Sequence, residues 1–130
     1  MYWYRTGVVG KGPCYPFLTL VNKIILDAHA RGASDIHIEP FPGKDNTRIR
    51  IRIDGSCAIY QNIPFHFKNA IVSRIKIMSD LDIAERRKPQ DGKIKFKKFG
   101  GKDIELRVAT LPTQGGLEDV RVRVKDFYFP

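Results

Sequence analysis

The chain has 130 residues, a length that fits one domain, and 42% of them are hydrophobic, which allows an ordinary globular core. Its formal net charge of +9 favours anionic partners, whether nucleotide phosphates, nucleic acid, acidic protein surfaces or anionic lipid. Two cysteines, Cys14 and Cys57, are too few for a disulfide framework and indicate reduced thiols in a cytosolic protein. Because the sequence has neither a signal-peptide pattern nor a membrane-length apolar run, it predicts a soluble protein that meets a membrane only through a partner.

Glycine and proline residues over positions 1–16 predict a loop-like lead-in. A helix is expected over 17–31, since apolar residues recur there at three- and four-residue steps, and Gly32 suits a left-handed cap at its end. The hydrophobic period then changes to two, which predicts strands over 35–39 and 47–53, and a third strand is expected over 56–63. Asp54-Gly55 is the dipeptide of a tight hairpin turn between the last two of these strands.

In the second half, a helix is expected over 68–79, followed by an irregular, charged segment over 81–90. Gln90-Asp91-Gly92 is interpreted as a turn, with Gly92 at positive φ. Alternating patterns then predict three more strands: 92–99, 102–111 and 120–125.

These elements predict an α+β fold in the order α-β-β-β-α-β-β-β. Short turns make the strands antiparallel, and two helices cover one face to give a PAS-like sandwich. The two groups of three strands either share one sheet or form two.

The sequence lacks the motifs of several enzyme classes. A phosphate-loop NTPase needs GxxxxGK[ST], and Gly100-Gly101-Lys102 has neither the spacing nor a following hydroxyl residue. The chain is therefore not expected to be an ATPase by itself, and no catalytic residue is assigned. The three histidines are far apart in sequence, which predicts ordinary surface or strand positions and no metal site: His29, His37 and His66.

Basic side chains alternate with apolar ones on three predicted strands, so that each strand has one basic face. These side chains are Arg48, Arg50 and Arg52; Lys93, Lys95 and Lys97; and Arg121, Arg123 and Lys125. One interpretation is a solvated surface whose charges discourage edge-to-edge aggregation. The other is an anion-facing surface, because the planar fork of arginine donates paired hydrogen bonds to phosphate.

Four ordered segments give the sequence a family resemblance. Residues 33–40 (ASDIHIEP), 48–55 (RIRIRIDG), 71–92 (IVSRIKIMSDLDIAERRKPQDG) and 105–113 (ELRVATLPT) resemble the motifs of type II secretion and type IV pilus assembly ATPases. The match covers residues 17–125 and identifies that span with the family's second amino-terminal domain, leaving 1–16 as a lead-in and 126–130 as a tail.

The resemblance implies a non-catalytic regulatory and assembly domain. In the family, this domain precedes a RecA-like motor domain that carries the phosphate loop, ATP and Mg, none of which is expected in this chain. It packs on the motor domain of a neighbouring subunit in a hexamer that needs the motor domain. The implied setting is the cytoplasm, peripheral to the inner membrane through platform proteins of the secretion or pilus machine.

The resemblance also implies roles for individual residues. Arg107 matches the arginine of the family's "LRVST" strand and Lys93 that of "PQDGR", so both are expected at nucleotide phosphates in the assembled ATPase. Six further arginines are expected at a subunit interface or facing phosphate: Arg86, Arg87, Arg123, Arg48, Arg50 and Arg52.

Residues 116–123 depart from the family pattern by an additional charge at Arg121. The chain is either a piece of a longer protein or a naturally short paralogue. The alternative functions are a nucleic-acid-binding module that uses the basic strand faces and a stand-alone sensor with a ligand between helix and sheet. Few aromatic residues alternate with the basic ones, which makes nucleic acid the less favoured partner.

Overall fold

The computed structural model describes residues 16–100 and 102–124. The elements in chain order are α1 (Pro16–Ala30), β1 (Asp35–Glu39), β2 (Thr47–Ile53), β3 (Ser56–Ile63), α2 (Lys68–Met78), β4 (Gln90–Lys95), α3 (Lys97–Gly100), β5 (Glu105–Pro112) and β6 (Glu118–Arg123). Two short 3₁₀ helices, Phe65–Phe67 and Gln114–Gly116, lie before α2 and β6. Residues 1–15 of the predicted lead-in, together with Cys14, Lys125 and the tail, lie outside the described residues.

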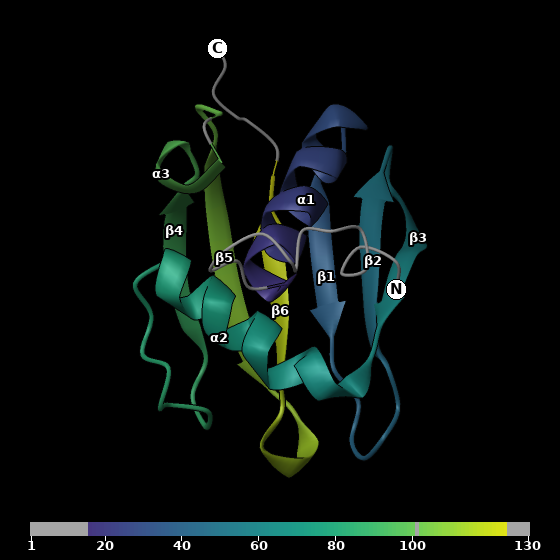
Figure 1. The fold of residues 1–130 in the computed structure, drawn as a ribbon, viewed down its shortest axis with the longest axis vertical. Coiled ribbons are helices and arrows are strands. Elements are labelled where there is room, and N and C mark those ends of the chain that lie inside the picture. Colours follow the sequence, from purple (N-terminus) through teal and green to yellow (C-terminus); the bar gives the residue numbers. More distant parts are fainter. Residues whose placement is uncertain (1–15, 101, 125–130) are drawn as a thin grey trace.

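The six strands form one antiparallel sheet in the order β3-β2-β1-β6-β5-β4 (Figure 1). Each group of three strands is a meander, and the two meanders join where β1 pairs with β6. The α+β class is therefore confirmed, and the two strand groups share one sheet. The likeness to a PAS-type sandwich stays a prediction.

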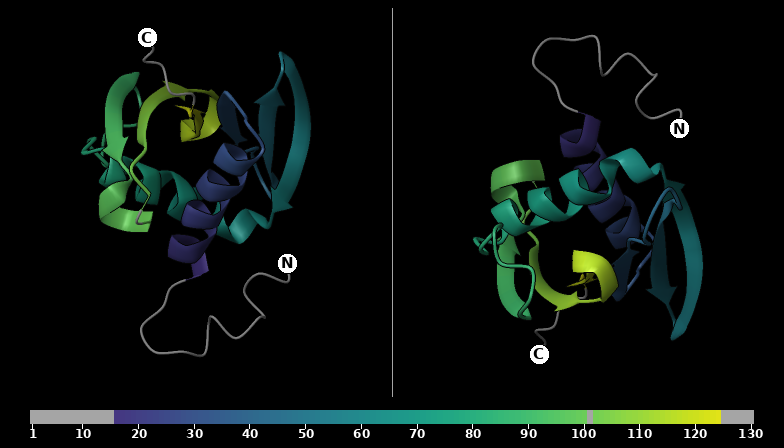
Figure 2. Two further views of the ribbon diagram at one scale, coloured as in Figure 1. Left: turned by 90° about the horizontal axis from the view of Figure 1, so that it is seen from above. Right: turned by 90° about the horizontal axis from the view of Figure 1, so that it is seen from below.

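Both long helices lie on the same face of the sheet, and the sheet curves around them (Figures 1 and 2). Apolar residues from α1 and α2 meet the inward positions of the strands in one core, whose members include Val21, Ile25, Ile36, Ile49, Ile75, Leu106 and Val122. The helix face is thereby closed by hydrophobic packing, and the opposite face of the sheet is left open.

Local signals account for the best-predicted boundaries. Gly32 has φ 73°, and the amides of Gly32 and Ala33 donate to the carbonyls of His29 and Ala28 at 3.1 and 2.9 Å. This is the Schellman pattern that ends a helix. Asp54 and Gly55 both have positive φ, 51° and 82°, as a type I′ hairpin turn requires.

The predicted strand over 92–99 is wrong at both ends. The strand begins at Gln90 and ends at Lys95, and residues 97–100 form α3 instead. Phe96 is fully buried, and Gly100 folds back onto its ring so closely that a Cβ there would lie 2.1 Å from the ring. The turn over the buried Phe96 therefore replaces the last four residues of the predicted strand, 96–99.

Gly92 does not form the predicted turn at positive φ; it lies within β4. A Cβ at this position would lie 2.7 Å from the carbonyl oxygen of Ser79 and 2.9 Å from the Leu81 side chain. The glycine is needed because the segment that follows α2 crosses the strand at this point, and no side chain fits between them.

Candidate anion-binding site

The open face of the sheet carries most of the basic residues selected from the sequence. On β2, Ile49 and Ile51 are buried beneath the helices, whereas Arg48, Arg50 and Arg52 project from the open face and are half-buried. His37 lies on the same open face, as its alternation with Ile36 and Ile38 predicts. The alternation of charged and apolar residues thus produces two faces of the sheet: an apolar face that packs in the core and a charged face that is open.

Pairing of the strands aligns charged residues into a row across this face. Lys93 on β4 is opposite Arg107 on β5, and Arg107 is opposite Arg123 on β6. Arg123 is in turn opposite Asp35 on β1, which is opposite Arg52 on β2. Neighbouring strands lie about 4.8 Å apart, so the row concentrates four cations and one carboxylate.

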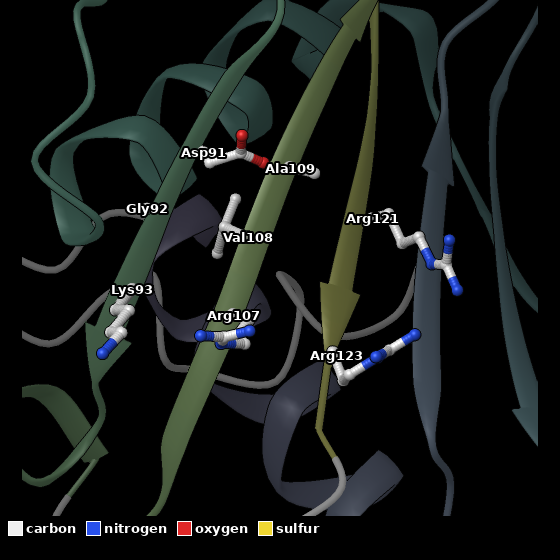
Figure 3. Close-up of a pocket in the computed structure, with 8 residues that line it drawn as sticks. All are labelled: Asp91, Gly92, Lys93, Arg107, Val108, Ala109, Arg121 and Arg123. Carbon is white, nitrogen blue, oxygen red and sulfur yellow. The ribbon is translucent and has the colours of Figure 1, made fainter.

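A hollow of about 410 Å³ lies over β4, β5 and β6 (Figure 3). Its charged lining residues are Asp91, Lys93, Arg107, Arg121 and Arg123, and its small ones are Gly92 and Ala109. In Figure 3 the side chains of Arg121 and Arg123 extend towards β1, away from Arg107, and Asp91 is directed towards Ala109. The sequence-selected residues Arg107, Lys93 and Arg123 are therefore brought together in one concave site.

Asp35 is the counter-ion of the arginines beside this hollow. One carboxylate oxygen lies 3.4 Å from Arg121 Nε and 3.5 Å from Arg123 Nε, and the other lies 3.8 Å from Arg52 Nε. The side chain of Asp35 is only 6% exposed. Burial alone would raise its pKa, but the hydrogen bond from Ser34 and the charges of Arg121 and Arg123 outweigh burial and lower the pKa.

A second carboxylate, Glu39, compensates the arginines at the other end of β1. Arg48 Nε donates to it at 3.0 Å, and Arg50 holds it with two hydrogen bonds of 3.1 and 2.8 Å. Burial of Glu39 acts to raise its pKa, and the hydrogen bonds from Arg50 and Arg48 outweigh that effect and lower the pKa. Arg48 and Arg50 are accordingly neutralised by Glu39 within the domain. Arg52, in contrast, shares the Asp35 carboxylate with Arg121 and Arg123.

Arg107 differs from these arginines, because within the described part of the chain it has no carboxylate partner. Its row neighbour Lys93 lies 3.5 Å from Glu105 in a pair whose side chains are both more than half exposed. Such a pair contributes little and exchanges readily with another anion. Arg107 and Lys93 are thus two cations on this face that an external phosphate can reach.

His37 lies between arginines on the same surface, opposite Arg50 on one side and Arg121 on the other. Its Nε2 is buried and has no hydrogen-bond partner among the described residues. Burial lowers the pKa of His37, and the charges of Arg50 and Arg121 lower it further, which favours the neutral imidazole.

Arg86 and Arg87 lie elsewhere, in the irregular segment between α2 and β4. The Gln90 side chain holds this segment, accepting from the Asp82 amide at 2.9 Å and donating to the carbonyls of Asp82 and Glu85 at 3.0 and 3.2 Å. Both arginines are exposed. The structure therefore presents them on a fixed loop and does not bring them to the hollow.

A buried ion pair supports that loop, and the sequence interpretation did not select it. Lys76 Nζ lies 2.7 Å from Glu118, and the two side chains are 1% and 3% exposed. Lys76 also donates to the Glu85 carbonyl at 2.8 Å, next to Arg86. The available signal was a lysine flanked by Ile75 and Ile77 on a helix.

Asp35 is the other functional residue that the sequence interpretation did not select. The Ser34 hydroxyl approaches the Arg52 carbonyl at 3.5 Å, and it donates to the Asp35 carboxylate at 3.0 Å. The role of Asp35 as a shared counter-ion was hidden, because Arg121 and Arg123 come from a strand far along the chain.

Two structural observations bear on the alternative functions. The cavity between α1, α2 and the sheet is only about 10 Å³, room for about one water and none for a sensor's ligand. The open-face positions of the six strands carry no Phe, Tyr or Trp on which bases could stack. Among residues 16–100 and 102–124, no cluster of metal-ligating side chains occurs, and no helix has the length and apolarity of a membrane span.

Comparison with known proteins assigns the chain to a family. The profile of the family described as Type II/IV secretion system protein matches residues 12–128. The chain belongs to this family, which includes the type II secretion and type IV pilus assembly ATPases.

Curated bacterial relatives agree with the family match. The type IV pilus assembly ATPase PilB of Myxococcus xanthus is 49% identical over 111 residues, 85% of this chain and 19% of the relative. The type II secretion system protein E of Xanthomonas campestris is 46% identical over the same shares of the two chains. The type II secretion system ATPase E of Vibrio cholerae is 40% identical over 85% of this chain and 21% of its own length. The chain thus spans about a fifth of the length of these relatives.

Proposed function

We propose that the chain is a non-catalytic regulatory and assembly domain of a type II secretion or type IV pilus assembly ATPase. It packs on the motor domain of a neighbouring subunit and presents Arg107 and Lys93 to the phosphates of the bound nucleotide. ATP and Mg belong to the motor domain, and hexamers form only with that domain. The setting is the cytoplasmic side of the inner membrane, reached through platform proteins.

The observation that carries this proposal is the state of Arg107. It projects from the open face beside a hollow, it lacks a carboxylate partner among the described residues, and Lys93 and Arg123 flank it. A guanidinium that has no carboxylate partner and is held on a strand is already in position to bind an anion carried by a partner protein. The identity of this chain to secretion and pilus ATPases supports a motor-bound nucleotide as the source of that charge.

Arg48, Arg50, Arg52 and Arg123 extend the same charged face, and we assign them to the contact with the neighbouring motor domain. The fixed loop with Arg86 and Arg87 supplies a second contact on another side of the domain. Both assignments follow from exposure and charge, since an acidic partner surface complements them.

The test is a titration of the chain against a separately expressed motor domain of its own system, with and without a non-hydrolysable ATP analogue. We expect a complex whose affinity rises with nucleotide, and we expect Arg107→Ala to abolish that rise. Lys44→Ala removes the same charge from the exposed loop before β2 and serves as the matched control, which should keep the full rise. Association that ignores nucleotide in the unaltered chain would overturn the proposal.

A further inference from the structure

We infer that the domain itself holds a site for a condensed phosphate anion, formed by Arg107, Arg121 and Arg123 around the hollow over β5 and β6. This inference goes beyond the proposed function, because the site needs no motor domain to complete it. Arg121, which departs from the family pattern, is its distinguishing member.

The shape of the site depends on a small residue at its floor. Ala109 is opposite Arg121 in the strand register, one open-face position along β5 from Arg107. Its methyl group leaves the space between Arg107 and Arg121 empty, and a longer side chain at this position would fill the hollow. A volume of about 410 Å³ falls within the roughly 300–1,000 Å³ of ligand pockets.

The charges around the hollow are under-compensated. Arg121 and Arg123 approach the same oxygen of Asp35 at 3.4 and 3.5 Å, and no described residue makes a well-formed hydrogen bond to that oxygen. Arg52 shares the other oxygen at 3.8 Å, so one carboxylate serves three guanidinium groups. Since each guanidinium has five N–H donors, Arg121 and Arg123 retain donors for an incoming anion.

Asp35 cannot move into the hollow with these arginines, because its side chain is almost fully buried on a central strand. It holds both guanidinium groups on the β1 side of the hollow, and Arg107 stands on the β5 side (Figure 3). An anion between them would be approached by cations from two sides, which is the arrangement that multidentate phosphate binding requires.

The spacing of the cations favours a chain of phosphates over a single one. Arg107 and Arg123 lie on strands about 4.8 Å apart, and Arg121 lies two residues, about 6.8 Å, along β6. Because Figure 3 shows Arg121 and Arg123 extending away from Arg107, several linked phosphoryl groups would reach all three guanidinium groups better than a single one. Asp91 closes one end of the hollow with negative charge, which directs the anion towards the arginines. The strand positions of this face carry no Phe, Tyr or Trp; the one aromatic ring known to contact an open-face arginine among the described residues, Phe41, lies beside Arg48 and outside the hollow, which argues against base stacking in this site.

The experiment is isothermal titration of the 130-residue chain with sodium tripolyphosphate and, separately, with orthophosphate at low ionic strength. We expect tripolyphosphate to bind at least about ten-fold more tightly than orthophosphate, with an affinity that falls as salt is added. Arg121→Gln should weaken tripolyphosphate binding roughly ten-fold, since charged hydrogen bonds are lost. The fold should survive, because Asp35 keeps Arg52 and Arg123.

Arg48→Gln is the matched control. It removes the same unit of charge from the same face, but Arg48 is engaged with Glu39 outside the hollow. We expect less than about a two-fold change in affinity for this variant. Ala109→Glu, which fills the floor with negative charge, should abolish binding and provides a second, independent variant.

Equal weakening by Arg121→Gln and Arg48→Gln would mean diffuse electrostatic attraction and would overturn the site. Equal affinity for the two anions, or displacement of tripolyphosphate by a single-stranded oligonucleotide at lower concentration, would overturn the assignment to condensed phosphate. The motor-domain titration reports on the proposed function separately: loss of tripolyphosphate binding with intact Arg107-dependent coupling would reject this site alone.

Discussion

The domain contains two groups of ion pairs that have similar chemistry and opposite surroundings. Lys76 and Glu118 meet at 2.7 Å beneath the helices and are almost completely buried. On the open face, Asp35 and Glu39 pair with five arginines whose side chains remain between a third and a half exposed. A buried pair cannot exchange partners without exposing a charge to a low dielectric, whereas a half-exposed arginine can turn to an external anion. Similar pairs therefore fix the structure on one side of the sheet and supply binding capacity on the other.

The largest expected effect is that of Lys76→Met. The substitution strands the Glu118 carboxylate in the core, and we expect a loss of about 3–5 kcal/mol in the free energy of unfolding. Urea denaturation at pH 7 measures the loss. Lys76→Met with Glu118→Leu should recover most of it, because no charge is then left buried and unpaired. A double variant as unstable as the single one would contradict the comparison.

A smaller effect is expected for Asp35→Asn, which keeps the shape of the side chain but leaves three arginines without their shared carboxylate. We expect a loss of about 1–2 kcal/mol at low ionic strength. Added salt should restore part of it, since mobile anions reach half-exposed guanidinium groups. The Lys76→Met loss should not respond to salt. The urea midpoints of both variants at low and high salt provide the measurement.

The acid dependence of stability gives a third, still smaller effect. The pKa values of Asp35 and Glu39 are lowered on folding, from unfolded values of 3.8 and 4.5. Below those values the unfolded chain binds more protons than the folded one, so these groups stabilise the fold above pH 4.5 and lose that contribution as pH falls through their folded pKa values. Glu39→Gln should flatten the decline in the urea midpoint between pH 5 and 3. Asp45→Asn, in the exposed loop before β2, is the control and should leave the decline unchanged.

The smallest effect is expected for Arg87→Gln. Its side chain is 91% exposed, and its distance to Glu85 is 3.9 Å. An ion pair of this kind is worth a few tenths of a kcal/mol, so the unfolding free energy should change by less than about 0.3 kcal/mol. A larger change would indicate that the loop contributes to the fold through Arg87 and not only through Lys76 and Gln90.

Much of the fold could be predicted from the sequence, because its signals are local. The strands over 35–39 and 47–53 keep a period of two, the strand over 56–63 follows the Asp54-Gly55 turn, and all three ranges are confirmed. The segment over 92–99 failed because Phe96 fits the same alternation whether the chain continues or turns. Only packing against Gly100 distinguishes the two, and this contact is tertiary.

The candidate site likewise has features that the sequence could predict and features that it could not. Alternation was sufficient to place Lys93 and Arg123 on exposed strand faces, and the family resemblance singled out Arg107, although their roles in an assembled ATPase stay predictions. Alternation could not reveal which arginines have carboxylate partners, because Asp35 and Arg123 lie at opposite ends of the described chain. The difference between a compensated and an uncompensated arginine depends on long-range pairing.

The pairing of β1 with β6 at the centre of the sheet also determines when the sheet can be completed during synthesis of the chain. A chain emerging from the ribosome completes its first three strands early, but β1 keeps an unpaired edge until almost the last described residue has been synthesised. Closing this long loop is the slow, entropically costly step expected of a topology dominated by distant contacts. The strand that closes it carries Arg121 and Arg123, so the charged surface and the folded state arise in the same event.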